Sequence, residues 1–207
     1  MMFADRHDAA IRLAAELGKY RGLYPLVLGI PRGAVPMARV IAGKLAGEVG
    51  VALVRKLGAP GNPEFAIGAV DETGWSQVAA HARSAGADAA YLEQETRAQV
   101  EVLKARRAAY AAVRPAADPQ GRIVIVVDDG LATGATMIAA LHALRARNPA
   151  KLICAVPVAP PETIDEVSRH CDQMVCLEAP DNFHSVGQFF RRFEQVSDAD
   201  VLAALKD

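Results

Sequence analysis

The chain has 207 residues, of which 52% are apolar and 23% charged, and its formal net charge at pH 7 is −1. This composition is typical of a globular protein with one well-filled core. The near-zero charge argues against broad electrostatic binding to nucleic acid or to an anionic membrane. No apolar run approaches the roughly 18 residues needed to span a bilayer. Three cysteines without zinc-ligand spacing indicate buried, reduced thiols, so we expect a cytoplasmic protein.

In the first half of the chain, apolar runs are separated by glycine and proline. They predict a helix within residues 1–22, a strand at 26–30, a helix at 37–47 and a strand at 51–56. The stretch "LGAPGNPEF" (57–65) contains two prolines and two glycines, which is typical of an exposed, mobile loop. We expect a lid over about residues 57–74.

The second half alternates in the same way. It predicts a hairpin at 66–80, a helix at 91–113, a strand at 122–127, a helix at 134–145, a strand at 151–159, a helix at 161–170, a strand at 173–177 and a terminal helix within 197–206. The long helix at 91–113 is interpreted as a solvated or dimer-facing element. Alternating strands and helices favour a three-layer α/β/α fold with a mainly parallel central sheet. We expect one domain over 1–207, with a small C-terminal hood at about 178–207.

The stretch "VIVVDDGLATGATM" (124–137) is the most informative part of the sequence. A buried strand leads directly into Asp128 and Asp129, at the carboxyl end where parallel sheets bind ligands. The following glycines let the backbone approach an anion, and a helix beginning near Gly134 points free N–H groups at it. The loop is no Walker A motif, because Ala135 stands where the lysine would be.

Two carboxylates cannot bind phosphate themselves, so they must serve sugar hydroxyls or a hydrated cation. Together with the loop they predict a sugar phosphate site with Mg²⁺ alongside. The alternative is that Asp128 and Asp129 simply end a strand and Thr133 caps a helix. Paired aspartates followed by T-G-x-T are much rarer than either feature alone, which favours the ligand site.

This stretch resembles the phosphoribosyl diphosphate (PRPP) binding motif of type I phosphoribosyltransferases. The resemblance implies that Asp128 and Asp129 hold the ribose hydroxyls and contact Mg²⁺ indirectly, through water or those hydroxyls. It also implies a set of residues around the 5′-phosphate: Ala132, Thr133, Gly134, Ala135 and Thr136.

Two further stretches offer cations to a diphosphate. "GIPRGAVP" (29–36) supplies Arg32 and Gly33 before a helix, and in the family the corresponding loop holds pyrophosphate, often through an unusual peptide geometry. "VRK" ends the second predicted strand, and alternation places Arg55 and Lys56 on opposite faces. One would meet the ligand, while the other could reach a partner subunit. The alternatives are that "GIPRGAVP" is an ordinary turn after a strand and that Arg55 and Lys56 are ordinary solvated charges.

The order of these stretches is similar to the adenine-type enzymes, with two departures. Ala132 replaces the aspartate that works on the base in 6-oxopurine enzymes, and the segment 57–64 lacks the lysine of family lids. Near the C-terminus, Phe183 is a candidate to stack on the base, and His184 is a weaker candidate for a general base. The other phenylalanines of that region, Phe189, Phe190 and Phe193, are expected to anchor a terminal helix in the core.

The favoured hypothesis is a Mg²⁺-dependent phosphoribosyltransferase acting on PRPP and a nitrogenous base, as a homodimer without membrane or nucleic-acid partners. Catalysis would rest on Asp128, Asp129, Arg55 and Lys56, with Arg32 and Gly33 also binding pyrophosphate. A PRPP-binding regulatory module without transferase activity is the alternative. A phosphosugar hydrolase is a third reading, which no nucleophile or metal-ligand cluster in the sequence supports.

Overall fold

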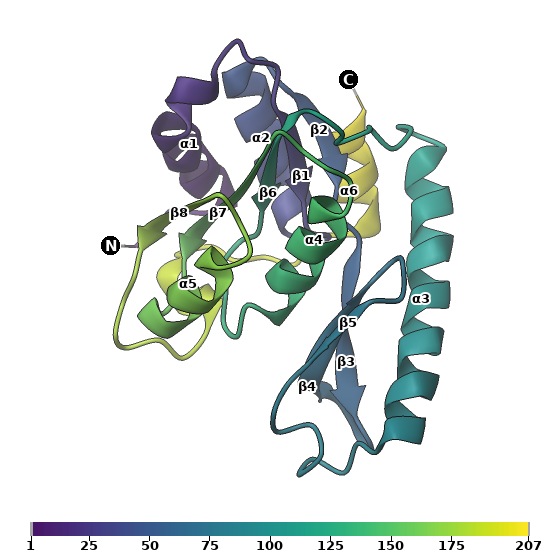
Figure 1. Cartoon of the computed structure of the whole chain (residues 1–207). Helices are drawn as coiled ribbons and strands as arrows, with labels where there is room; N and C mark the ends of the chain where they lie inside the picture. The colour runs from purple at the N-terminus through teal and green to yellow at the C-terminus, as the bar shows by residue number, and fades with distance from the viewer. Residues whose placement is uncertain (1, 207) are drawn as a thin grey trace.

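The computed structural model describes residues 2–206, apart from the side chain of Glu64. Its centre is a five-stranded sheet in the order β2-β1-β6-β7-β8 with every neighbouring pair parallel. The strands are β1 (Leu26–Gly29), β2 (Glu48–Val51), β6 (Ile123–Val127), β7 (Lys151–Val158) and β8 (Gln173–Glu178). Helices cover both faces (Figure 1), so the predicted three-layer α/β/α fold is confirmed.

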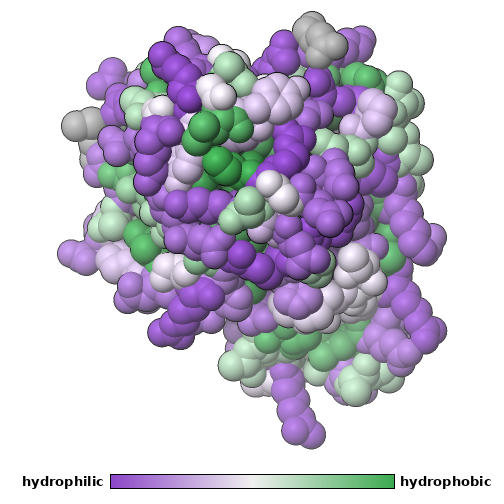
Figure 2. All heavy atoms as spheres, turned by 45° about the horizontal axis from the view of Figure 1, so that its top comes forward, coloured by the Kyte–Doolittle hydropathy of each residue, from purple (hydrophilic) through white to green (hydrophobic). Residues whose placement is uncertain are grey.

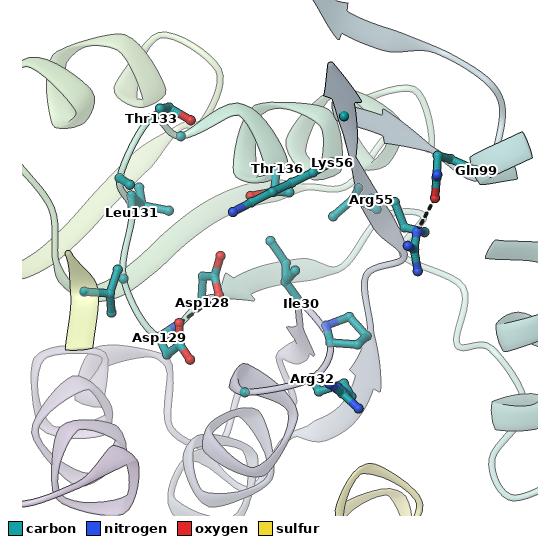
Figure 3. Close-up of a pocket in the computed structure, with 18 of the residues that line it drawn as sticks. Ile30, Arg32, Arg55, Lys56, Gln99, Asp128, Asp129, Leu131, Thr133 and Thr136 are labelled. Atoms are coloured by element: carbon teal, nitrogen blue, oxygen red, sulfur yellow. Dashed lines mark hydrogen bonds between the residues drawn. The ribbon is translucent and has the colours of Figure 1, made fainter. Parts of the chain in front are cut away.

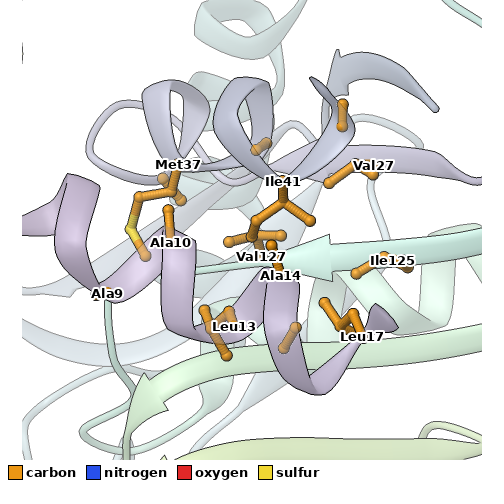
Figure 4. Packing of buried hydrophobic residues seen from close by; sticks show 14 of the residues in the cluster. Ala9, Ala10, Leu13, Ala14, Leu17, Val27, Met37, Ile41, Ile125 and Val127 are labelled. Carbon is orange, nitrogen blue, oxygen red and sulfur yellow. The ribbon is translucent and has the colours of Figure 1, made fainter. Parts of the chain in front are cut away.

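The two faces of the sheet bury different side chains because successive residues of a strand point in opposite directions. Val27, Ile125 and Ile153 pack against α1 (Arg6–Glu16) and α2 (Ala34–Leu45), as Figure 4 shows for the first two. The intervening residues of these strands face α4 (Ala135–Arg145) and α5 (Pro161–Ser168). Burial on both faces explains the nearly continuous apolar runs.

An insertion, defined as residues 52–121, separates β2 from β6 and forms a second sheet. Its strands β3 (Val54–Ala59), β4 (Asn62–Asp71) and β5 (Ser76–Val78) are antiparallel, in the order β3-β4-β5. The long helix α3 (Ala89–Ala111) runs beside this sheet (Figure 1) and packs against β3 and β4. The insertion therefore stands beyond the carboxyl ends of the parallel strands.

Two sequence predictions about this insertion are wrong. The run 51–56 is not one strand: β2 ends at Val51 and β3 begins at Val54, in the other sheet. Its unbroken apolar pattern arises because the connector Ala52–Leu53 is itself buried. The segment 57–65 is not an irregular loop, since Pro60-Gly61 lies between paired Ala59 and Asn62 as a tight turn with Gly61 at φ +71°. Proline then glycine at these positions is typical of such turns.

The C-terminal segment packs back on the first layer. After β8 come the 3₁₀ turn η2 (Val186–Phe189) and α6 (Asp198–Leu205), and a second 3₁₀ turn, η1 (Gly18–Tyr20), follows α1. Phe190 is buried and Phe189 and Phe193 are half-buried against the α1–α2 core, as expected. They anchor the segment around η2, however, and not the terminal helix α6, which packs in another apolar cluster. Ser197 and Asp200 form a reciprocal cap at the start of α6.

Among the described residues, no helix is long and apolar enough to cross a membrane. The face shown in Figure 2 is mostly hydrophilic, with apolar residues in small separate groups. Cys154 is buried, whereas Cys171 and Cys176 are half-buried, and all three are free thiols. Burial raises the pKa of the Cys154 thiol well above its ordinary value. These properties are those of structural thiols.

Candidate functional site

A cavity of about 550 Å³ opens between the parallel sheet and the insertion, a size in the range of small-molecule sites. It is lined by residues 30–33 after β1, residues 54–56 of β3, residues 128–134 and Thr136 after β6, the α3 residues Glu95, Gln99 and Arg106, and Gly58, Pro63 and Val186. All three stretches singled out in the sequence therefore meet around one cavity.

The loop after β6 is shaped by glycine. Gly134 has φ +75°, and a Cβ atom there would lie 2.7 Å from the Val167 side chain. Behind the loop, the buried hydroxyl of Thr163 on α5 donates to the Ala132 carbonyl at 2.7 Å. Ala132, Thr133, Gly134 and Thr136 line the cavity, whereas Ala135, the first residue of α4, does not. The start of α4 provides unpaired N–H groups for an anion.

Asp128 and Asp129 lie together at one end of the cavity but have different partners. The backbone N–H of Asp129 donates to Asp128 Oδ1 at 2.9 Å, which is the hydrogen bond drawn in Figure 3. Within the described chain, no cation lies within ion-pair distance of Asp128. Asp129, in contrast, is paired with Arg6 of α1, whose Nη2 lies 2.8 Å from Oδ2.

This environment penalises the charged form of Asp128. Burial raises the pKa of the Asp128 carboxyl well above its ordinary value, and the neighbouring charge of Asp129 adds to the rise. The N–H of Asp129 and the cations of Lys56 and Arg6 oppose it without cancelling it. A bound cation or hydroxyl donors would therefore stabilise the charged form of this carboxyl.

The loop after β1 places Arg32 and Gly33 beside the aspartates. The Pro31–Arg32 peptide bond is cis, in line with the unusual geometry that the family resemblance implies. A Cβ atom on Gly33 would lie 2.2 Å from Oδ2 of Asp129, so only glycine fits there. Arg32 is half-exposed, 3.9 Å from Asp198, and is available to a ligand anion.

Arg55 and Lys56 point to opposite sides of β3, as predicted. Figure 3 shows Lys56 extending toward Asp128 and Thr136, and Arg55 pointing toward α3. The Nε of Arg55 donates to Gln99 Oε1 at 2.5 Å, and Gln99 Nε2 donates to Glu95 Oε1 at 2.9 Å. Burial lowers the pKa of Arg55, and the nearby charge of Arg106 lowers it further. Arg55 therefore lines the cavity of its own chain.

Sequence reasoning missed five residues of this site. They are Arg6, Thr163 and the α3 residues Glu95, Gln99 and Arg106. The α3 residues had a signal, since spacings of four and eleven place them on one helix face. Arg6 and Thr163 had none, because their partners are distant in sequence.

The C-terminal candidates lie outside the cavity. Phe183 stacks on Phe189 with ring centroids 5.4 Å apart, and His184 is exposed. Of the described residues after 177, Val186 lines the cavity, next to Gly130. The role of Phe183 in base binding stays a prediction, without a cavity contact to support it.

Comparisons with known proteins agree on the family. Residues 4–192 match the phosphoribosyl transferase domain. The crystal structure of TT1426 from Thermus thermophilus is similar, with a TM-score of 0.82 and 46% identity over 99% of this chain and 98% of that chain.

Two Mycobacterium tuberculosis proteins, Rv0571c (strain H37Rv) and MT0597 (strain CDC 1551), are described as candidate phosphoribosyl transferases. Each is 40% identical over 205 residues, covering 99% of this chain and 46% of the relative. The chain thus spans about half the length of these curated relatives. The family match and these identities show that the chain belongs to the phosphoribosyl transferase domain family.

Proposed function

We propose that this chain transfers the 5-phosphoribosyl group of PRPP to a nitrogenous base, a reaction of nucleotide salvage. A ring nitrogen forms a bond to C1 of the ribose as the C1–O bond to pyrophosphate breaks. The leaving pyrophosphate takes the bonding electrons, and the nitrogen loses its proton to solvent. The transition state has oxocarbenium character, as in glycoside cleavage.

The arrangement of charges along the cavity carries this proposal. The loop 130–136 and the start of α4 suit the 5′-phosphate, while Asp128 and Asp129 suit the ribose hydroxyls. Arg32 and Lys56 lie where a diphosphate would need cations, with Arg55 and Arg106 on the wall formed by the insertion. Preorganised charges of this kind are the main means by which enzymes stabilise a charged leaving group.

Mg²⁺ fits this site as a partner of the ligand. Among the described residues, no group of three or more His, Cys, Asp or Glu side chains converges on one point. The unpaired Asp128 carboxylate is a hard oxygen donor of the kind Mg²⁺ prefers. Asp128 and Asp129 would hold the ion through water or ribose hydroxyls, and the ion would offset charge on the diphosphate.

Pyrophosphate release tests the proposal. The chain is incubated with PRPP, Mg²⁺ and a panel of purine, pyrimidine and other heteroaromatic bases, and PRPP binding is measured by calorimetry. We expect the double variant Asp128→Asn/Asp129→Asn to bind PRPP about 100-fold more weakly, because two hydrogen-bonding carboxylates are lost. Asp165→Asn, an exposed position on α5, serves as the matched control and should change nothing.

The outcomes separate the candidate functions. PRPP binding without pyrophosphate release on any base would favour the regulatory module. Unchanged PRPP affinity in the double variant would show that the aspartates are misassigned. Release of phosphate from sugar phosphates without an acceptor would favour a hydrolase.

We also propose a cytoplasmic location and a homodimer. The three free thiols suit a reducing compartment. Arg55 meets the cavity of its own chain, so a partner subunit is not required for its contribution.

A further inference from the structure

Arg6 and Asp129 form a contact that no part of the proposed function uses. They are separated by 123 positions in the sequence. The Nε and Nη2 atoms of Arg6 each lie 2.8 Å from Oδ2 of Asp129, with the two side chains 16% and 18% exposed. The hydrogen bond from Nε and the close ion-pair approach of Nη2 restrain this carboxylate, in a pair that is mostly buried.

Arg6 is itself restrained from two other directions. Its Nη1 donates to the Glu194 carbonyl at 2.7 Å. Its guanidinium carbon lies 3.7 Å from the centroid of the Phe193 ring, close enough for a cation–π contact. Arg6 also begins α1, which Asp5 caps. The guanidinium therefore has a defined orientation without any ligand.

The pair occupies the space beneath the loop that carries Arg32. A Cβ atom on Gly33 would lie 2.2 Å from Asp129 Oδ2 and 2.9 Å from Arg6 Nε. Arg6 and Asp129 thus lie directly beside the loop proposed to bind the diphosphate. A shift of either side chain would disturb that loop as well as the ribose contact.

The two oxygens of Asp129 consequently have different environments. Oδ2 accepts from Arg6, whereas Oδ1 has no hydrogen bond within the described chain. We infer that Arg6 is a positioning residue, which holds Asp129 by Oδ2 so that Oδ1 is presented to a ribose hydroxyl of PRPP. This inference rests on the proposed function. Holding a carboxylate in its bound orientation reduces the entropy lost on binding.

A double-mutant cycle tests the inference. PRPP affinity is measured with Mg²⁺ for the native chain, Arg6→Met, Asp129→Asn and the double variant. We expect Arg6→Met to raise Kd about tenfold in the native chain and less than about twofold in the Asp129→Asn background, because the two side chains act as one unit. Arg6→Lys keeps a cation but only part of the contacts, and should restore an intermediate affinity.

Arg192→Met is the matched control. Arg192 also pairs with an aspartate at the start of α1, Asp5 at 2.6 Å, but does not contact Asp129. Its removal should leave PRPP affinity unchanged. Once an acceptor is known, Arg6→Met should raise KM for PRPP with little change in kcat, the pattern of lost uniform binding.

An equal effect of Arg6→Met in both backgrounds would overturn the inference, since Arg6 would then act only on general structure. If the native chain does not bind PRPP, the proposed function fails. The same cycle is then measured by urea unfolding without ligand. Additive effects of Arg6→Met and Asp129→Asn on the free energy of unfolding would show that Arg6 does not hold Asp129. Non-additive effects would support the restraint of Asp129 by Arg6.

Discussion

The two sheets of this chain bring different charged groups to the same cavity, since both carboxylates of the aspartate pair and Arg32 follow parallel strands whereas Arg55 and Lys56 belong to the antiparallel sheet. The parallel sheet ends in Asp128 and Asp129 and in a loop braced by α5, and its middle strands are buried on both faces. The antiparallel sheet carries Arg55 and Lys56 on β3, and β3 and β4 pack against α3. Under the proposed function, the first region would bind the sugar and its 5′-phosphate. The second would supply the cations Arg55 and Lys56 to the diphosphate.

The two regions meet mainly where α4 packs against β3, β4 and β5. Trp75, in the turn between β4 and β5, stacks on His142 of α4 with ring centroids 3.7 Å apart. The carboxylate of Asp71 accepts from the backbone N–H groups of Thr73 and Trp75 and so shapes this turn. Apolar packing crosses the same boundary, because Val54 and Ala69 of the insertion lie in one buried cluster with Met137 of α4. The stacked rings therefore add to a shared apolar interface.

The largest effect is expected at Lys56, the cation of the antiparallel sheet that extends toward Asp128. We expect Lys56→Met to lower kcat/KM about 10²- to 10³-fold by removing charge stabilisation from the leaving group. Pyrophosphate release measures this, with Lys104→Met on the exposed side of α3 as the control. Equal activity of Lys56→Met and Lys104→Met would show that Lys56 of the antiparallel sheet does not contribute to catalysis.

Loss of the Trp75–His142 contact should come next. We expect Trp75→Ala to lower the free energy of unfolding by about 2 kcal/mol, because a half-buried aromatic ring is lost. Urea unfolding followed by circular dichroism measures this. Tryptophan fluorescence cannot serve, because Trp75 is the one tryptophan of the chain. Trp75→Phe should retain most of the stability. An unchanged midpoint for Trp75→Ala would mean that the apolar packing of α4 on β3 and β4 holds the two regions together without the stacked rings.

A smaller effect is expected on the parallel-sheet side, at Thr163. Thr163→Val keeps the shape but removes the hydroxyl that bonds the Ala132 carbonyl. We expect Kd for PRPP to rise about fivefold, equivalent to about 1 kcal/mol for one hydrogen bond, with Thr163→Ser restoring the native value. Calorimetry on folded variants measures it. A serine variant as weak as valine would indicate that the methyl group, not the hydroxyl, supports the loop.

The smallest effect concerns pH and the stability of the ligand-free chain. Because the folded pKa of Asp128 is raised, the folded state binds its proton more tightly than the unfolded state. The free energy of unfolding therefore falls as pH rises above the pKa that Asp128 has in the unfolded chain, because the folded state disfavours the charged carboxylate. Without Mg²⁺ and PRPP, we expect Asp128→Asn to raise Tm by a few degrees at pH 8 and by less at pH 5. A lower Tm for this variant at pH 8 would contradict the direction of the shift.

Local patterns in the sequence were enough for the layers of the fold and for most contributors to the cavity. The apolar strand before Asp128, the glycines and threonines after it, and the cations after β1 and in β3 are all contiguous signals. Parallel strands bring their carboxyl ends to one edge, which explains why the stretches after β1 and β6 meet. Arg55 and Lys56 reach the same cavity from the antiparallel sheet. The wrong predictions lie in the insertion, where buried connectors and a proline–glycine turn imitate a longer strand and a loop.

The sequence alone determined the family, the parallel sheet and the loop residues after β1 and β6 that line the cavity, because those depend on residues that are neighbours along the chain. Only the tertiary structure decided that Asp128 and Asp129 have unlike partners, that α3 forms a wall of the cavity and that Phe183 packs on Phe189. Each of these depends on a contact between distant segments. The energy of such a contact comes from desolvation and from geometry, which no local pattern records.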